Sequence, residues 1–310
     1  MKIIAVLVLA LAALVASDDI NWRKLRPAWR MPRYWQRLPK EVMKQMLSEL
    51  KDLPKNRPEG RIVGGYHATP GQFPYQVVMI SQFPQGGALC GGSVLSQNFV
   101  LTAAHCVDQA SGGTVILGAH DRTNAAEVGQ VRIPFVQSGI YLHQNWDPSL
   151  IRYDIATVRL QSPVTYSDRI QPVNLPRWSD VANDFAGVTG TVSGFGRFSD
   201  AVDAASDTLR YVTNPIQTNT ACNIRFLGLI QPENICLSGE NGRGACSISM
   251  PRNGDSGGPM TISRDGKTVQ VGVVSFGLAL GCERNWPSAF TRTTSFLQWI
   301  QAHSDVIIEA

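Results

Sequence analysis

The segment GSVLSQNFVLTAAHC, residues 92–106, carries the pattern that decides the fold of this 310-residue chain. Short runs rich in Val, Leu and Phe alternate in it with polar and turn-forming residues. The same alternation continues in the segments YQVVMI (75–80), GTVILGAH (113–120), ATVRL (156–160), VQVGVVSFG (269–277) and SAFTR (288–292). Many short strands with frequent turns are typical of an all-β barrel or sandwich.

The part of the chain that follows this pattern begins at Ile62 and holds about 250 residues, which fits a pair of packed barrels better than one small barrel. Its last stretch, TSFLQWIQAHSDVII (294–308), places apolar residues near helical spacing, so we expect a C-terminal helix there. Apolar residues make up 44% of the whole chain and charged residues 17%, a composition typical of a globular protein.

The first 17 residues have the organisation of a signal peptide. Lys2 precedes an apolar run from Ile3 to Val15, and the small residues Ala16 and Ser17 follow it. As a helix this run would cover about 20 Å, less than the roughly 30 Å of a bilayer core. A membrane anchor or a core helix is the alternative. We expect a secreted, extracellular protein with no membrane attachment after removal of residues 1–17, because no later segment is long and apolar enough to cross a bilayer.

Residues 18–61 differ in charge from the rest of the chain and form a separable leader. They contain 12 Lys and Arg against 6 Asp and Glu, a net charge of +6, whereas residues 62–310 have a net charge of −3. The overall charge of +4 therefore belongs to the leader and does not indicate a nucleic-acid partner. Within the leader, residues 40–53 have helical apolar spacing; this helix could dock on the main domain or remain solvated.

Three short segments supply the groups that acyl transfer by a serine requires: a hydroxyl, a base and a buried carboxylate that orients the base. LTAAHC offers His105, and YDIATVRL offers Asp154 ahead of an apolar run that would bury it. NGDSGGP offers Ser256 among glycines, where the backbone can turn sharply and point its N–H groups inward. A lone His is more often structural and a lone Asp before a strand is usually a turn residue. The three contexts together, in this order, do not arise by chance.

These segments, together with IVGG (62–65) and VVSFG (273–277), closely resemble the chymotrypsin-like serine peptidases from Ile62 to about Ile308. They are similar to arthropod digestive enzymes of the chymotrypsin and elastase type. The resemblance implies an all-β peptidase domain, residues 62–310, with two packed six-stranded antiparallel Greek-key β-barrels, a boundary near residue 172 and a C-terminal helix. It also implies hydrolysis of peptide bonds in proteins or peptides through an acyl-enzyme.

The resemblance gives each residue of the site a role. Ser256 would be the nucleophile, His105 the general base that later protonates the leaving amine, and Asp154 the carboxylate that fixes the imidazole tautomer. The amides of Gly254 and Ser256 would form the oxyanion hole. No cofactor is implied and we expect no metal, because the histidines do not cluster as zinc ligands would and the loop after Gly118 has too few acidic residues for calcium.

The leader resembles the activation segment of this family, whose members are made as zymogens. Residues 18–61 would be an activation pro-segment, cut between Arg61 and Ile62 by a trypsin-like peptidase. The new α-amino group would pair with Asp255 and order the pocket and oxyanion hole, so that the buried ion pair acts as a switch. Since residues 18–61 contain no cysteine, the pro-segment should leave after cleavage.

Six cysteines in an exported chain suggest disulfides, although their number alone does not pair them. The family pattern implies the pairs Cys90–Cys106, Cys222–Cys236 and Cys246–Cys282. The first would hold the His105 loop and the last the specificity pocket. Each would contribute about 2–4 kcal/mol of stability.

An insertion near Ser256 makes the position of the specificity pocket depend on the residue from which one counts. The chain has six more residues between Cys246 and Ser256 than the family usually has, and these are most simply SISMPR, 247–252. Counting back from Ser256 puts the pocket floor at Met250. Counting back from Cys246 puts the floor at Gly244, with Ala245 beside it, and we choose this count because the expected disulfide anchors Cys246. The insertion is either a rim loop that modifies access or a neutral bulge.

The pocket walls should include Ser275, Gly277 and Ser288. None of these residues is acidic, so a buried Arg or Lys of a substrate would have no partner, at a cost of several kcal/mol. Glycine at the floor and at 277 leaves room for Phe, Tyr, Leu or Met, a chymotrypsin-like preference. Ser288 could instead narrow the pocket towards smaller, elastase-like residues.

These inferences favour a secreted, monomeric serine endopeptidase, most simply a digestive one, because the leader is short and contains no cysteine-knotted regulatory module. Two alternatives remain. One is a catalytically weak or inactive homologue that acts as a binding or regulatory protein, which only the insertion supports. The other is a cascade peptidase with a narrow target, which would share the chemistry.

Overall fold

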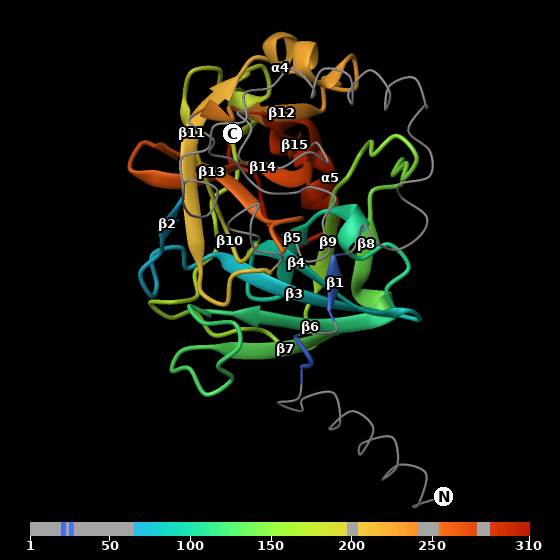
Figure 1. Ribbon diagram of the computed structural model, residues 1–310, viewed down its shortest axis with the longest axis vertical. Coiled ribbons are helices and arrows are strands. Elements are labelled where there is room, and N and C mark those ends of the chain that lie inside the picture. Colours follow the sequence, from blue (N-terminus) through green and yellow to red (C-terminus); the bar gives the residue numbers. More distant parts are fainter. Residues whose placement is uncertain (1–19, 23–24, 28–64, 197–203, 241–253, 278–285) are drawn as a thin grey trace, which may run out of the picture.

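The computed structural model of the chain describes residues 20–22, 25–27, 65–196, 204–240, 254–277 and 286–310 (Figure 1). Two β-sheets hold most of the regular structure in these ranges, and the helices are few and short. The predicted class, an all-β fold with two barrel-like sheets and a C-terminal helix, is confirmed.

The first sheet comes from the N-terminal half of the chain and has the strand order β7-β6-β3-β4-β5-β9-β8. β3 is apolar on both of its faces: Val77 and Met79 belong to one buried cluster, and Val78 and Ile80 to another. This alternation lets a single strand join two cores. The strands are β3 (Gln76–Phe83), β4 (Gly86–Val94), β5 (Phe99–Thr102), β6 (Gly112–Leu117), β7 (Val131–Val136), β8 (Ile140–Leu142) and β9 (Ala156–Arg159).

The second sheet closes into a barrel. Its order is β10-β13-β14-β15-β12-β11, and β11 pairs again with β10. The short strand β2 (Tyr66–His67) adds to the outer edge of β11. β11 alternates buried with half-exposed residues, as a strand on a barrel wall must. The barrel strands are β10 (Thr189–Gly194), β11 (Arg210–Gln217), β12 (Asn234–Leu237), β13 (Pro259–Arg264), β14 (Lys267–Phe276) and β15 (Ser288–Arg292).

The first sheet differs from the predicted six-stranded barrel because pairing between strands does not close it. Its end strands β7 and β8 are consecutive in the chain, and the 3-10 turn η4 (Gln137–Gly139) connects them. β7 pairs with β6 and β8 pairs with β9, but no pairing joins β7 to β8 among the described strands. The covalent turn therefore spans the opening of what is a half-barrel.

The C-terminal helix is α5 (Leu297–Ala302), preceded by the 3-10 turn η7 (Thr293–Phe296). It packs Phe296, Trp299 and Ile300 into the core of the first sheet, although the strand before it, β15, belongs to the second. The other α-helix in the described ranges, α4 (Asn219–Phe226), is capped by Thr218, whose hydroxyl accepts a hydrogen bond from the amide of Ala221. Residues 40–53, where a helix was expected, lie outside the described residues.

The two sheets meet along a seam that includes buried polar side chains from both. The side-chain hydrogen bonds that cross it include Tyr75 to Thr261 (3.1 Å), Ser193 to Gln76 (2.6 Å) and Ser93 to Gln270 (2.5 Å). No helix in the described part of the chain is long and apolar enough to cross a membrane.

Candidate active site

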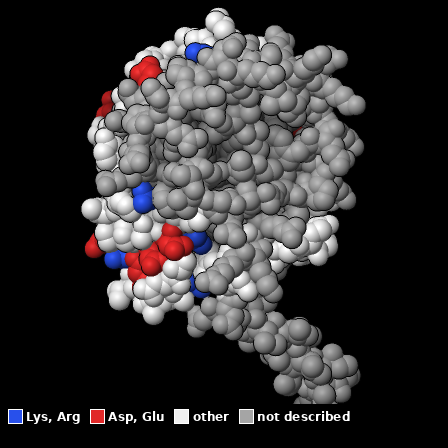
Figure 2. Space-filling view, viewed as in Figure 1, with Lys and Arg blue, Asp and Glu red and all other residues white. Residues whose placement is uncertain are grey.

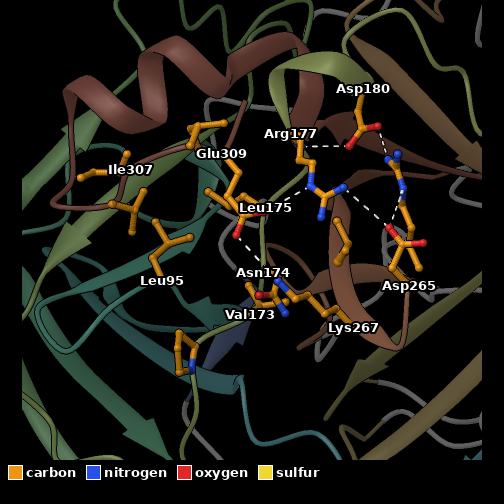
Figure 3. Close-up of a pocket in the computed structure, with 15 residues that line it drawn as sticks. Leu95, Val173, Asn174, Leu175, Arg177, Asp180, Asp265, Lys267, Ile307 and Glu309 are labelled. Atoms are coloured by element: carbon orange, nitrogen blue, oxygen red, sulfur yellow. Dashed lines mark hydrogen bonds and ion pairs between the residues drawn. The ribbon is translucent and has the colours of Figure 1, made fainter.

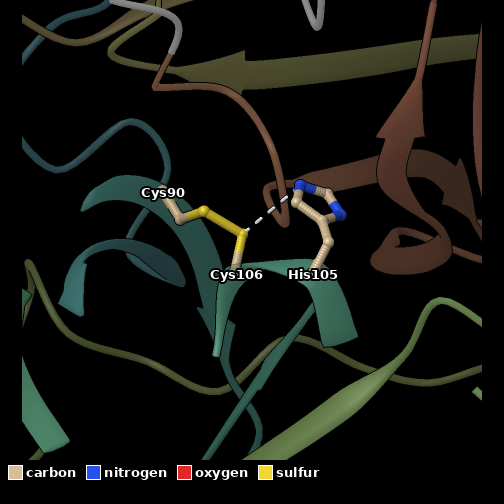
Figure 4. Close-up of side chains that lie close together, drawn as sticks. All are labelled: Cys90, His105 and Cys106. Atoms are coloured by element: carbon tan, nitrogen blue, oxygen red, sulfur yellow. Dashed lines mark hydrogen bonds between the residues drawn. A yellow bond between two sulfur atoms is a disulfide. The ribbon is translucent and has the colours of Figure 1, made fainter. Parts of the chain in front are cut away.

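His105 lies where β5 gives way to the 3-10 turn η3 (Ala104–Cys106), which turns the residue into the interior with only 5% exposed. The disulfide between Cys90 and Cys106 ties this turn to β4 (Figure 4). A covalent cross-link one residue away therefore restrains the position of the imidazole.

Asp154 holds His105 through one contact to the ring and one to the backbone. Its Oδ2 lies 2.8 Å from His105 Nδ1, and its Oδ1 accepts a hydrogen bond from the backbone N–H of His105 at 3.0 Å. Ser275 Oγ donates a third hydrogen bond, to Oδ2, at 2.6 Å. Because an ionised carboxylate only accepts hydrogen bonds, the Nδ1 of the neutral ring carries the proton and Nε2 is left as the basic nitrogen.

The chain around Asp154 is bent and anchored. Ile151 and Tyr153, just before it, have positive φ angles of 53° and 55°. The backbone carbonyl of Asp154 accepts a hydrogen bond from Thr291 Oγ1 of β15 at 2.7 Å. Unusual backbone conformations of this kind tend to occur at functional sites, where the surroundings hold them in place.

Ser256 lies in a loop that glycines allow to pack against the first sheet. Gly257 has a φ of +80°, and any side chain there would collide with Thr102 Oγ1. The carbonyl of Ser256 accepts a hydrogen bond from the amide of Gly91 at 2.7 Å, which fixes the loop against β4. Only 2% of Ser256 is exposed.

The loop with Ser256 and the turn with His105 lie next to each other. Cys106 Sγ is 3.4 Å from the carbonyl oxygen of Ser256 and 3.7 Å from His105 Nε2 (Figure 4). No hydrogen bond joins the Ser256 hydroxyl to the His105 ring, two residues that the structure describes. Such bonds are often long in unliganded sites and shorten in the substrate complex. The three residues predicted to act together are therefore brought to one place.

The backbone amides of residues 254–258 divide into bonded ones and ones without an acceptor in the described part of the chain. The amides of Gly257 and Gly258 donate to the carbonyls of Val274 and Asp255, both at 2.8 Å. The amides of Gly254 and Ser256, the predicted oxyanion hole, have no acceptor among the described residues. Gly254 also packs so closely on Leu89 that a Cβ would lie 2.9 Å from Leu89 Cδ2.

Asp255 is buried, and glycines line the space around its carboxylate. Its Oδ1 accepts a hydrogen bond from the amide of Gly196 at 2.7 Å. A side chain at Gly194 or Gly196 would collide with the carboxylate. Arg61 and Ile62, the expected cleavage site and partner, lie outside the described residues.

The described pocket residues lie on β14, just beyond it, and on β15. Ser275 and Ser288 are buried and Gly277 is half-buried. The hydroxyl of Ser275 donates to Asp154, a contact with a predicted catalytic side chain that the sequence did not indicate, because the two residues are 121 positions apart. Gly244, Ala245, Met250 and the insertion 247–252 lie outside the described residues.

The structure contains two of the three expected disulfides, Cys90–Cys106 and Cys222–Cys236. Cys246 and Cys282 lie outside the described residues. Within the described ranges, one group of His, Cys, Asp and Glu side chains is close enough to hold a metal: Cys90, His105 and Cys106. Both sulfurs of this group are in the disulfide, so it offers no thiolate to a metal.

A cavity of about 220 Å³ lies away from the triad, between the C-terminal residues and the turn from β13 to β14 (Figure 3). Its charged side chains neutralise one another: Arg177 and Lys267 both approach Glu309, at 3.2 and 3.7 Å, and Arg264 pairs with Asp180. We therefore assign no ligand to this cavity.

Comparison with known proteins places the chain among peptidases. The family model "Trypsin" matches residues 62–300. Brachyurin from Leptuca pugilator is 39% identical over 245 residues, which cover 79% of this chain and 99% of brachyurin. Chymotrypsin from Phaedon cochleariae is 37% identical over 252 residues, 81% of this chain and 85% of that protein.

A solved structure supports the same assignment. The structure of HL collagenase aligns with a TM-score of 0.70 at 33% sequence identity, covering 80% of this chain and 100% of that one. The similarity therefore extends over a solved chain in full.

Proposed function

The chain belongs to the trypsin family and is a chymotrypsin-like serine endopeptidase, and from this premise we propose that His105, Asp154 and Ser256 are its catalytic residues. The observation that carries this proposal is the buried Asp154–His105 pair, which orients the imidazole and leaves Nε2 as the base beside the Ser256 loop.

The reaction follows from this arrangement. Ser256 Oγ attacks the carbonyl carbon of the peptide bond as its proton passes to His105 Nε2. The amides of Gly254 and Ser256 donate hydrogen bonds to the negative oxygen that forms. The imidazolium then gives its proton to the leaving amine, and the C–N bond breaks to leave an acyl-enzyme. Water, deprotonated by His105, hydrolyses the ester and restores the serine.

Covalent labelling tests the assignment. The full chain, cut with trypsin after Arg61, should react with a fluorophosphonate at Ser256, and substitution of Ser256 by Ala should abolish the label. Labelling at another residue, or none on a correctly cut chain, would overturn the catalytic assignment. It would then favour the alternative of a binding or regulatory homologue.

We propose in addition that residues 1–17 are a signal peptide, residues 18–61 an activation segment, and residues 62–310 a secreted, monomeric peptidase domain with a boundary near 172. Cleavage of Arg61–Ile62 by a trypsin-like peptidase would let the new α-amino group reach Asp255. The burial of Asp255 and the glycines around its carboxylate support this step, since a buried carboxylate favours a cationic partner.

For substrate choice we propose a pocket with Gly244 and Ala245 at its floor and Ser275, Gly277 and Ser288 on its walls. An uncharged pocket favours apolar or aromatic residues before the cut bond. Kinetics of the cleaved chain on four peptides, with Phe, Leu, Ala or Arg before the cut bond, test this directly. The value of kcat/KM should be largest for Phe or Leu, and fast cleavage after Arg would contradict the pocket.

A digestive role is proposed from the simple leader, which contains no cysteine that could tie a regulatory module to the peptidase. Among the relatives, one is named a clotting factor G beta subunit, so a cascade role has to be tested separately. A profile of cleaved peptides from a complex protein mixture distinguishes them. Broad cleavage after apolar residues supports digestion, and one preferred sequence supports a cascade.

A further inference from the structure

Part of the leader lies against the first sheet. The two-residue strand β1 (Arg26–Pro27) pairs with β4 in the parallel direction, with Arg26 opposite Ala88 and Pro27 opposite Leu89 (Figure 1). β4 pairs with β3 from Gly86 to Ser93 but with β5 only at Ser93 and Val94. On this second edge, Gly91 bonds to Ser256 and Thr102, and β1 is the only described strand that pairs with residues 86–90. Open edges of this kind accept extended peptides.

Apolar side chains of the leader fill a matching surface beside this edge. Ile20, Trp22 and Leu25 pack on a buried cluster that spans both sheets and includes Val78, Ile80, Leu89, Ile116, Phe195 and Leu209. Leu25 packs against β4 at Gly87, which has no side chain. A Cβ at Gly87 would lie 2.5 Å from Leu25 Cδ2. A side chain at Gly87 would therefore have to displace the end of the Leu25 side chain.

Trp22 also covers a charged group. The guanidinium carbon of Arg122 lies 4.5 Å from the centre of a Trp22 ring, in the range of a cation–π contact. Arg122 is only 4% exposed, and burial lowers its pKa from the ordinary value. Its Nε donates to the carbonyl of Ser206 and its Nη2 pairs with Asp207, but Nη1 has no hydrogen-bond partner in the structure. Loss of Trp22 would leave this cation without its aromatic cover.

Charge adds to these contacts. The leader has a net charge of +6 and residues 62–310 a net charge of −3, so the two parts attract each other. Figure 2 shows a group of Asp and Glu side chains on the described part of the visible face.

We propose that residues 20–22 and 25–27 are a docking segment that holds the leader on β4 after the Arg61–Ile62 bond is cut, so that the mature protein is a noncovalent two-chain complex. This rests on the proposed cleavage at Arg61. The absence of cysteine from the leader had suggested that it leaves, but strand pairing, the packing of Leu25 against Gly87 and the Trp22–Arg122 contact hold it without a disulfide.

The docked strand also borders the catalytic loop. β1 runs in the same direction as β4, towards Gly91, whose amide donates to the carbonyl of Ser256. Pro27 pairs with Leu89, whose side chain lies against Gly254. The retained leader is therefore a neighbour of the nucleophile.

The test uses the full chain with residues 57–61 replaced by an enteropeptidase site and with Ser256→Ala, so that cleavage before Ile62 depends neither on trypsin nor on catalysis. Intact mass confirms the cut. In size-exclusion chromatography at micromolar concentration the leader should elute with residues 62–310. Separate elution of the leader would overturn the proposal.

Matched variants locate the contact. Trp22→Ala and Gly87→Val should each weaken leader retention about 10-fold or more, whereas Asn21→Ala, an exposed neighbour, should not change it. Equal retention in all three variants would contradict residues 20–22 and 25–27 as the docking segment.

Hydrogen exchange on the uncut chain checks the same contact without any cleavage. Trp22→Ala should raise amide exchange in residues 86–89 and leave the distant strand β12 unchanged. A rise in exchange throughout the chain would mean that Trp22→Ala is misfolded, and the same measurement on Gly87→Val then tests the contact. If exchange in residues 86–89 rises in neither variant, the docking proposal is refuted. Lack of fluorophosphonate labelling would refute the catalytic assignment and leave this proposal standing.

Discussion

At the scale of single residues, Asp154 is the best-determined part of the site, because three hydrogen bonds fix its carboxylate. Asp154→Asn should lower kcat about 10⁴-fold, since an amide in this position favours the wrong imidazole tautomer. Burst kinetics with an ester substrate measure the loss. The exposed Asp168→Asn serves as the control and should leave kcat unchanged. A kcat within 10-fold of the original for Asp154→Asn would contradict the assigned role.

Ser275 is a positioning residue for the same carboxylate. Ser275→Ala removes the hydroxyl that donates to Asp154 Oδ2 at 2.6 Å, and kcat should fall about 10-fold. The pH profile of kcat should shift as well, because the environment of the Asp154–His105 pair changes. Ser263→Ala, exposed on β13, is the control. An altered KM with unchanged kcat and pH profile would show that Ser275 acts only in the pocket.

At the scale of elements, the loop between β6 and β7 is held by one carboxylate. Glu127 Oε2 accepts hydrogen bonds from the amides of His120 and Asp121, both at 2.9 Å, and Oε1 pairs with Arg169 at 2.6 Å. Burial tends to raise the pKa of Glu127, but these hydrogen bonds and Arg169 together lower it below 4.5. Arg169 therefore helps to hold the Glu127 carboxylate, and with it the loop, in place.

Glu127→Gln should therefore lower Tm at pH 7 by about 2–4 °C, a loss of about 1 kcal/mol. The contribution of a carboxyl with a lowered pKa is complete above its unfolded-state pKa and disappears as the pH falls through the lower folded value. The difference in Tm between the two proteins should accordingly close as the pH falls through the lowered folded-state pKa of Glu127. Glu240→Gln, exposed, is the control. A difference that persists at low pH would mean that the loss is one of packing.

At the scale of the whole molecule, the site exists only because the two sheets meet. His105 and Asp154 come with the first sheet, whereas Ser256 and Ser275 come with the second. The seam between them is polar but closed to water at Tyr75, where burial raises the pKa of the phenol to about 12. A rigid, hydrogen-bonded seam fixes the position of His105 relative to Ser256, the proposed base and nucleophile.

The proposed activation belongs to the same scale, because a cut at residue 61 would have to act on a loop near residue 255. Asp255→Asn should leave cleavage at Arg61 intact but lower the rate of fluorophosphonate labelling about 100-fold, since the oxyanion hole loses its order. The uncut form of each protein is the control, and both uncut forms should label equally slowly. Full labelling of the cut variant would refute the ion-pair switch.

The sequence by itself determined the local features. Short apolar runs between turns specify the strands, the apolar spacing after residue 294 specifies α5, and the glycines around Ser256 specify a sharp loop. These depend on interactions between near neighbours in the chain, which is why a pattern of residue types is enough to predict them.

Only the tertiary structure decided which distant groups meet. Ser275 and Asp154 are 121 residues apart, and Trp22 lies a hundred residues from the Arg122 it covers, so no local pattern marks either contact. The open edge of β4 likewise results from where β5 stops pairing. Such contacts depend on how whole sheets curve and close. That curvature results from many weak interactions between segments that are distant in the chain, so no single segment predicts it.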